Sequence, residues 1–196
     1  LARLNPYMTL MEKIGRFHGQ LNDGAVQAVE VEYSGDIVEE NTSPLIPSLL
    51  QGIIAPILGP TINFVNARLV ADQRGVEIKE VRNSTQPYGY ASLITVRVRT
   101  ETGSHLICGT LFGPDNPRIT RVDDFWVEMA PDGQFIVAYH TDKPGIIGSV
   151  GQILGAHDIN IAGMQVGRIT ARGQAVMVLS VDERPPAKVL DKIRAI

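Results

Sequence analysis

The sequence contains one cysteine among 196 residues, so no disulfide can form within the chain. This excludes a small scaffold held together by disulfides, the usual design of short secreted domains. Apolar runs are also short: the longest candidate, residues 45–58, is interrupted by two prolines, whereas a membrane span needs roughly 18 to 20 apolar residues. We therefore expect no membrane association and no secretion signal, and we take the cytoplasm as the location.

Neither nucleic-acid binding nor catalysis is indicated by charge or motifs. The chain has 18 basic and 21 acidic residues, a net charge of −3, which gives no basic surface for nucleic acid. No G-x-G-x-x-G motif is present, and the glycines at Gly145 and Gly148 have the wrong spacing for a dinucleotide site. The four histidines are scattered, without metal-ligand spacing. We expect no catalytic residue, metal or cofactor in this chain.

Two further features have plain structural interpretations. Cys108 lies in an apolar run and is interpreted as a buried core thiol rather than a reactive one. Asp123 and Asp124 are adjacent, so their side chains would point apart, and we interpret them as solvated charges rather than an acid–base pair.

The apolar spacing divides the chain at the turn Pro131–Gly133, which gives two predicted domains, residues 1–130 and 134–196. The first mixes helices and strands. Its expected helices are 7–21, 44–58 and 62–74, the last closed by Gly75, and its expected strands are 29–33, 76–81, 92–100, 105–112 and one or two within 118–129.

The second domain has a simple predicted order of strand, helix, strand, strand, helix. The expected ranges are 135–139, 144–156, 160–168, 174–181 and 185–196. This order is one strand short of the ferredoxin-like β-α-β-β-α-β arrangement. The fold class is therefore α+β, with a mixed α/β domain followed by a ferredoxin-like domain that lacks its last strand, which leaves its first strand at a sheet edge.

The segment from His140 to Gly145 carries the most chemistry. Pro144 suits the first position of a helix, and the amides at a helix start, with the positive end of the dipole, favour a carboxylate. Asp142 can bind an ammonium group, so the segment suits a zwitterionic amino acid. The alternatives are that Asp142 only caps the helix, that His140 is structural, and that Asn160 merely begins its strand.

These residues carry a resemblance to a known family. The stretch from Val137 to Arg168 resembles an ACT domain, specifically that of the D-3-phosphoglycerate dehydrogenase family. The preceding part resembles the intervening, or allosteric substrate-binding, domain of the long forms of that family. The matching segments are His140, Asp142, Pro144–Gly145, Gly148 and Asp158–Ile161 in the second part, and Gly35–Val38, Asn63–Ala67, Gly75–Glu77, Gly109–Gly113 and Pro117–Arg121 in the first.

The resemblance implies that L-serine binds between paired ACT domains and inhibits a parent NAD-dependent dehydrogenase, whose NAD site would lie in a catalytic part outside this chain. The effector-binding positions that it implies are His140, Asp142, Pro144, Gly145, Asn160 and Ile161. Self-association would pair the second strands of two domains and place Asn160 of one copy opposite His140 and Asp142 of the other.

In the first domain, the resemblance implies an anionic small-molecule effector at Arg118 and Arg121. Solvated strand arginines are an equal alternative, because Ala130 and Ser180 occupy positions where some relatives have arginine. Two other functions stay open for the whole chain. It could belong to an iron–sulfur L-serine dehydratase, although one cysteine cannot hold such a cluster, or it could be an ACT module that senses another amino acid or serves only in assembly.

Overall fold

The computed structural model of the chain describes residues 4–196 and contains two compact units. The first unit extends to Asp123 and includes Met129–Pro131; the second comprises Asp124–Glu128 and Asp132–Ile196. Helices and strands are mixed in the first unit and arranged as an α/β sandwich in the second, so the α+β class is confirmed. Within residues 4–196, no helix is both long and apolar enough to cross a membrane.

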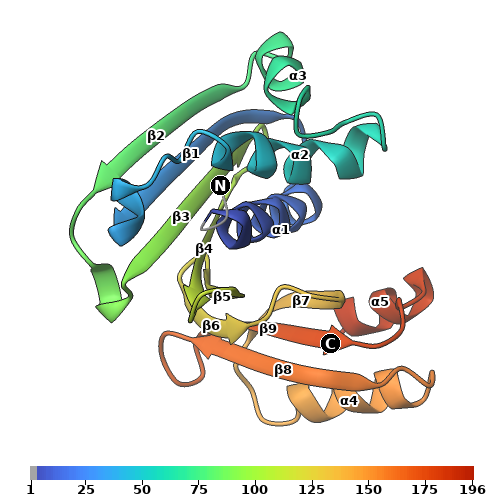
Figure 1. Cartoon of the computed structure of the whole chain (residues 1–196). Helices are drawn as coiled ribbons and strands as arrows, with labels where there is room; N and C mark the ends of the chain where they lie inside the picture. Colours follow the sequence, from blue (N-terminus) through green and yellow to red (C-terminus); the bar gives the residue numbers. More distant parts are fainter. Residues whose placement is uncertain (1–3) are drawn as a thin grey trace. The chain divides into compact units, whose positions relative to one another are not determined.

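The first unit is built on a sheet in the order β2-β1-β3-β4-β5 (Figure 1). Strand β1 pairs in parallel with β2, and the other neighbours are antiparallel. The elements are α1 (Asn5–Leu21), β1 (Val26–Gly35), the 3₁₀ turn η1 (Asp36–Glu39), α2 (Leu45–Leu58), α3 (Ala67–Gln73), β2 (Glu77–Asn83), the 3₁₀ turn η2 (Pro87–Gly89), β3 (Ser92–Thr100), β4 (Ser104–Phe112) and β5 (Asn116–Val122). Strand β6 (Phe125–Met129) falls mainly in the second unit.

Alternating apolar residues of the central strands form the core of this unit. Successive side chains of a strand point to opposite faces, so a period of two places one apolar set under the helices. Helix α1 packs on β4 and β5, and α2 packs on α1. The buried side chains of this layer include Leu10, Met11, Ile14, Val29, Val31, Tyr33, Leu49, Ile53, Ile94, Val96, Val98, Ile107 and Ile119.

Glycines set the distance between α1 and α2. A Cβ atom added at Gly15 would overlap the carbonyl of Leu49, and one added at Gly52 would overlap the carbonyl of Glu12. The two helix backbones therefore approach more closely than any larger residue allows. This contact fixes the helical layer over the sheet.

Helix α3 is shorter than the predicted 62–74. It starts at Ala67, because the side chains of Asn63 and Asn66 bind nearby backbone groups and hold a turn in place of the first helical residues. Its end agrees with the sequence: Gly75 has φ +71°, and the amides of Gly75 and Val76 donate to the carbonyls of Asp72 and Ala71.

The sequence-based prediction is confirmed for Cys108 and wrong for Asp123. Cys108 is buried as predicted, and this burial raises the pKa of its thiol. Asp123 was expected to be a solvated charge, and this expectation is wrong. Its carboxylate accepts hydrogen bonds from His105 Nδ1 and from the Leu106 amide, both at 2.8 Å. Asp123 lies in the turn between β5 and β6 and adopts φ +51°, a conformation that aspartate tolerates in turns. In this position its side chain accepts the hydrogen bonds of both donors.

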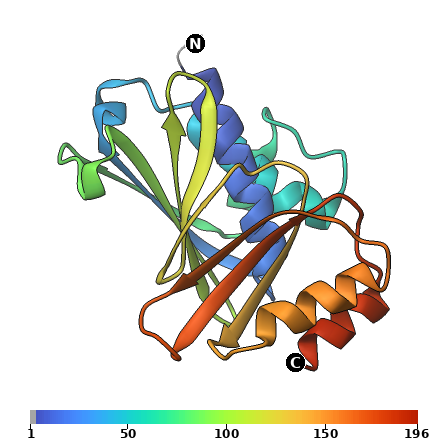
Figure 2. The ribbon, with the colours of Figure 1, turned by 90° about the horizontal axis from the view of Figure 1, so that it is seen from below.

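The second unit is a three-stranded antiparallel sheet in the order β7-β9-β8, with both helices on one face (Figure 2). Its elements are β7 (Gln134–Thr141), α4 (Ile146–Gly155), β8 (Ile161–Arg168), β9 (Gln174–Val181) and α5 (Ala187–Arg194). The core between sheet and helices consists of Ile136, Val150, Leu154, Ile159, Met177, Leu179, Val181, Val189 and Ile193.

Both outer strands of this sheet have an open edge. Among the described residues, β7 and β8 each pair with β9 alone. The edge position predicted for the first strand is therefore confirmed. Unpaired strand edges carry N–H and C=O groups that can pair with another strand, so each edge is a potential binding surface.

Candidate functional site

The chain between β7 and α4 forms a tight turn that brings polar groups to the start of the helix. Gly145 adopts φ +93°, a left-handed conformation that favours glycine, and α4 then begins at Ile146. Pro144 therefore lies before the helix rather than at its first position, which corrects the expectation. No side chain caps α4, so the interpretation of Asp142 as a simple helix cap is wrong.

Asp142 instead joins the ends of two strands. Its Oδ2 accepts a hydrogen bond from Arg168 Nη1 at 2.7 Å and from the Arg172 amide at 3.1 Å. Its own amide donates to the carbonyl of Gly173 at 2.8 Å. The Arg168 guanidinium, and next the Arg172 amide, lower the pKa of the Asp142 carboxyl. Asp142 is therefore a fixed, ionised carboxylate.

His140 lies two residues before Asp142, with one ring nitrogen bonded and the other not. Nδ1 lies 3.0 Å from the carbonyl oxygen of Thr141, and because a carbonyl only accepts, this nitrogen carries the proton. Nε2 is then an acceptor in the neutral ring. It is shielded from solvent and has no hydrogen-bond partner within residues 4–196. A buried polar atom without a partner is uncommon and is a candidate ligand contact.

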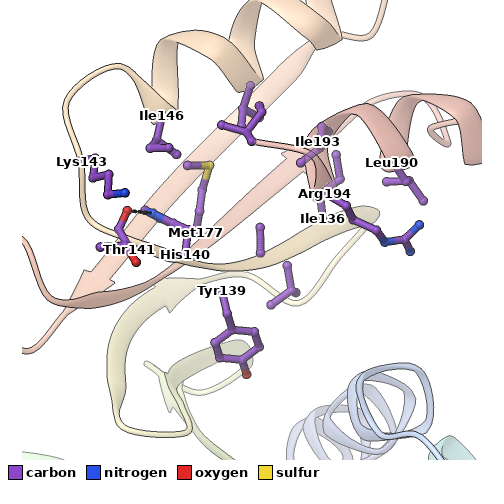
Figure 3. A pocket seen from close by; sticks show the side chains of 14 residues that line it. Ile136, Tyr139, His140, Thr141, Lys143, Ile146, Met177, Leu190, Ile193 and Arg194 are labelled. Atoms are coloured by element: carbon purple, nitrogen blue, oxygen red, sulfur yellow. Dashed lines mark hydrogen bonds between the residues drawn. The ribbon is translucent and has the colours of Figure 1, made fainter.

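His140 lines a cavity of about 480 Å³ beside the open edge of β7. Figure 3 shows that Met177, Ile146 and Ile136 form part of its apolar wall. Lys143 lies near His140, and Arg194 lies toward the end of α5. The cavity therefore combines an apolar interior with two cationic side chains.

Asn160 and Ile161 lie far from this turn within one chain. Asn160 directly precedes β8, and Asp142 directly follows β7. Both strands are antiparallel to β9, so these two residues are at opposite ends of the sheet, about 20 Å apart at roughly 3.3 Å per residue. Asn160 is exposed, and its Nδ2 donates to Asp182 Oδ2 at 2.7 Å. One copy of the second unit thus does not bring Asn160 to His140 and Asp142.

Arg118 and Arg121 of the first unit point to the same face of the sheet. Residues three apart normally face opposite sides, but a β-bulge makes Arg118 pair with Thr110 and Arg121 with Cys108, which are two apart. Arg118 donates to Asn116 and Pro117 and lies over the Phe112 ring, and Arg121 Nε donates to the Asp123 carbonyl at 2.6 Å. Both side chains are half-buried.

Comparison with known proteins assigns both units. Residues 3–123 match the D-3-phosphoglycerate dehydrogenase intervening domain, and residues 135–196 match the ACT domain. The chain belongs to the D-3-phosphoglycerate dehydrogenase family. Similar proteins include D-3-phosphoglycerate dehydrogenases from Methanocaldococcus jannaschii (38% identical over 196 residues, all of this chain), Synechocystis sp. (34% over 194, 98%) and Bacillus subtilis (35% over 192, 98%).

The chain spans 37%, 35% and 36% of the length of these three dehydrogenases. The resemblance seen in the sequence is confirmed, and the first and second units are an intervening domain and an ACT domain. Within residues 4–196, no group of three or more His, Cys, Asp or Glu side chains is placed to hold a metal ion.

Sequence reasoning missed Arg168 and Arg172 of the ACT domain. Arg168 comes from the end of β8, and Arg172 from the turn before β9, so neither is near Asp142 in sequence. A signal was present in the strand register. His140 and Arg168 both pair with Ala175 on the central strand, so they are level across the sheet, and Arg168 therefore lies at the Asp142 end.

Proposed function

We propose that this chain is the regulatory part of a D-3-phosphoglycerate dehydrogenase and that its ACT domain binds L-serine as a feedback inhibitor between two copies. The dehydrogenase activity and the NAD site would belong to the part of the enzyme outside this chain, and we place the enzyme in the cytoplasm. The family assignment and the chemistry of the turn after β7 support this proposal.

The observation that carries the proposal is the placement of complementary polar groups at opposite ends of the three-stranded sheet, whose β8 edge is open. His140 and Asp142 lie at one end of the sheet and Asn160 at the other. If the free edges of two β8 strands pair in antiparallel fashion about a two-fold axis, the start of one β8 lies beside the end of the other. Asn160 of a second copy would then reach the turn that holds Asp142.

Such a site has a group for each part of the amino acid. Asp142 would bind the ammonium group, and the first amides of α4, beside Pro144 and Gly145, would bind the carboxylate. Nε2 of His140 and the amide of the second copy's Asn160, next to Ile161, would bind the side-chain hydroxyl. Binding across two copies stabilises one arrangement of the subunits, so the effector shifts the population toward it.

Calorimetry of the chain with L-serine and with a panel of other amino acids tests the proposal. We expect heat with L-serine, together with a larger species by sedimentation velocity when serine is present. Heat with another amino acid alone would show that this ACT domain senses a different effector. The absence of heat with every amino acid would contradict ligand binding and leave the ACT domain as an assembly module.

The comparisons favour the dehydrogenase over the iron–sulfur serine dehydratase, because the first unit matches the intervening domain of the dehydrogenase. For that unit, the bulge that aligns Arg118 and Arg121 supports a second proposal, a small anionic effector on this face of the sheet. Titration with inorganic phosphate and with a small phosphate monoester tests it. The variant Arg121→Met should weaken binding, and equal binding in the variant would favour ordinary strand arginines.

A further inference from the structure

Asp142, which would bind the ammonium group of the amino acid, already binds a cation of its own chain. The Arg168 guanidinium donates to Asp142 Oδ2 at 2.7 Å, across the start of the central strand β9. The Arg172 amide donates to the same oxygen at 3.1 Å. The carboxylate thus accepts two hydrogen bonds before any ligand arrives.

The two donors differ in how easily they can leave. Arg172 donates through its backbone, and the turn that contains it is fixed to Asp142 by the hydrogen bond from the Asp142 amide to Gly173. Arg168 donates through a long side chain that is 55% exposed, whereas the Asp142 side chain is only 23% exposed. The guanidinium can therefore turn into solvent while the carboxylate stays in place.

Resting on the function proposed above, we propose that Arg168 is an internal competitor that sets the affinity of the effector site. The ammonium group of the amino acid replaces the Arg168 guanidinium on Asp142, and the Arg172 amide keeps its hydrogen bond. The chain thereby selects ligands whose remaining contacts, to the start of α4, His140 and a second copy, compensate for the lost ion pair. A bare ammonium ion or a simple amine, which lacks these contacts, competes poorly with Arg168.

The size of the effect follows from the exposure of the pair. An ion pair open to solvent contributes little, so its removal changes a binding constant roughly two- to fivefold. The variant Arg168→Met keeps the length of the side chain and removes its charge. We expect it to bind the amino acid roughly two- to fivefold more tightly than the wild-type chain does.

The experiment is calorimetry of the whole chain with L-serine and the amino-acid panel, with Arg168→Met as the test variant. Arg68→Met is the matched control, because Arg68 is also exposed and paired, to Asp72, but lies in α3 of the first unit. In an Asp142→Asn background, Arg168→Met should no longer increase affinity, since the competition requires the carboxylate. Equal or weaker binding by Arg168→Met, in a wild-type background that binds, would overturn the proposal and leave the effector site intact.

A second measurement follows the ion pair without any ligand. The carboxyl ¹³C signal of Asp142, titrated by NMR, should show a lowered pKa in the wild-type chain and a rise of that pKa in Arg168→Met. An unchanged pKa would show that the Arg168–Asp142 pair does not form in solution, and it would overturn the proposal that Arg168 competes with the amino acid. If neither chain binds any amino acid although the pKa does rise, the proposed function fails, and the competitor fails with it.

Discussion

The two units use the same residue types in different ways, and their histidines show this most clearly. His18 of the intervening domain is completely buried, with Nε2 3.2 Å from the Val96 carbonyl and Nδ1 3.1 Å from Asn22 Nδ2. His140 of the ACT domain is half-buried, and its Nε2 has no partner among residues 4–196. The first histidine is satisfied by the fold, and the second is left with an available acceptor.

The glycines show the same contrast. Those of α1 and α2 lie against the backbone of the facing helix, whereas a Cβ added at Gly148 or Gly151 of α4 would meet open space. The glycines of α1 and α2 therefore close the core of the intervening domain. In the ACT domain, the glycines of α4 leave space and His140 leaves an available acceptor, as binding of a ligand or of a second copy requires.

The largest difference should come from adding bulk at a glycine in each unit. In the intervening domain, Gly52→Val places a branched side chain against the Glu12 carbonyl, and we expect a loss of stability of about 3 kcal/mol or more. In the ACT domain, Gly151→Ala should stabilise α4 by about 0.5 to 1 kcal/mol. Chemical denaturation measures both, and hydrogen exchange of α1 and α4 peptides assigns each change to its unit. Equal changes in unfolding free energy for Gly52→Val and Gly151→Ala would contradict the proposed difference between the two units.

A second test uses the pH dependence of the stability that His18 contributes. Burial lowers the pKa of His18 from 6.5 to about 3, so the unfolded chain binds one more proton than the folded chain between these values. The stability that the neutral ring contributes is complete above pH 6.5 and is lost as the pH falls toward 3, by about 1.4 kcal/mol per pH unit.

The difference in unfolding free energy between the wild-type chain and His18→Gln should therefore shrink with this slope from pH 6 to pH 4. A constant difference for His18→Gln would show that His18 is accessible to protons in the folded chain.

A third test concerns binding rather than stability. Asp142→Ala removes the partner of the ammonium group, so we expect amino-acid affinity to fall severalfold. Asp72→Ala, which removes an equally charged but exposed side chain of α3 in the first unit, should leave affinity unchanged. Asn160→Ala should also weaken binding, although Asn160 lies at the far end of the sheet. Unchanged affinity in Asp142→Ala, with stability retained, would contradict the ammonium contact.

Most of the fold could be predicted because the apolar periods are regular. The alternation in β1 and the spacing in α1 and α4 identified these elements. Local side-chain chemistry caused the errors: the Asn63 and Asn66 hydrogen bonds shortened α3, and Gly145 moved the start of α4 past Pro144. Such effects depend on one or two hydrogen bonds, which a period of apolar residues does not encode.

The candidate site was harder to predict from the sequence, because the residues that contact one another there come from separate strands. His140 and Asp142 are close in sequence and could be proposed together. Arg168 could not, since its contact with Asp142 depends on how β7, β9 and β8 align. Asn160 remains a prediction that only a second copy can test, because one chain holds it at the opposite end of the sheet.

The smallest expected effect compares exposed ion pairs in the two units. Arg16 donates to Glu12 at 2.8 Å along α1, and both side chains are partly exposed, so Arg16→Ala should cost about 0.5 kcal/mol or less. Arg168→Met should change stability by a similarly small amount, because the Arg168–Asp142 pair is also open to solvent. Thermal denaturation at low and high salt measures both. The two pairs should then differ only in the presence of an amino acid, which competes for Asp142 and not for Glu12. A loss of stability well above 1 kcal/mol in Arg168→Met alone would make that pair a structural link between β7 and β8, since a competitor must be able to leave without unfolding the sheet.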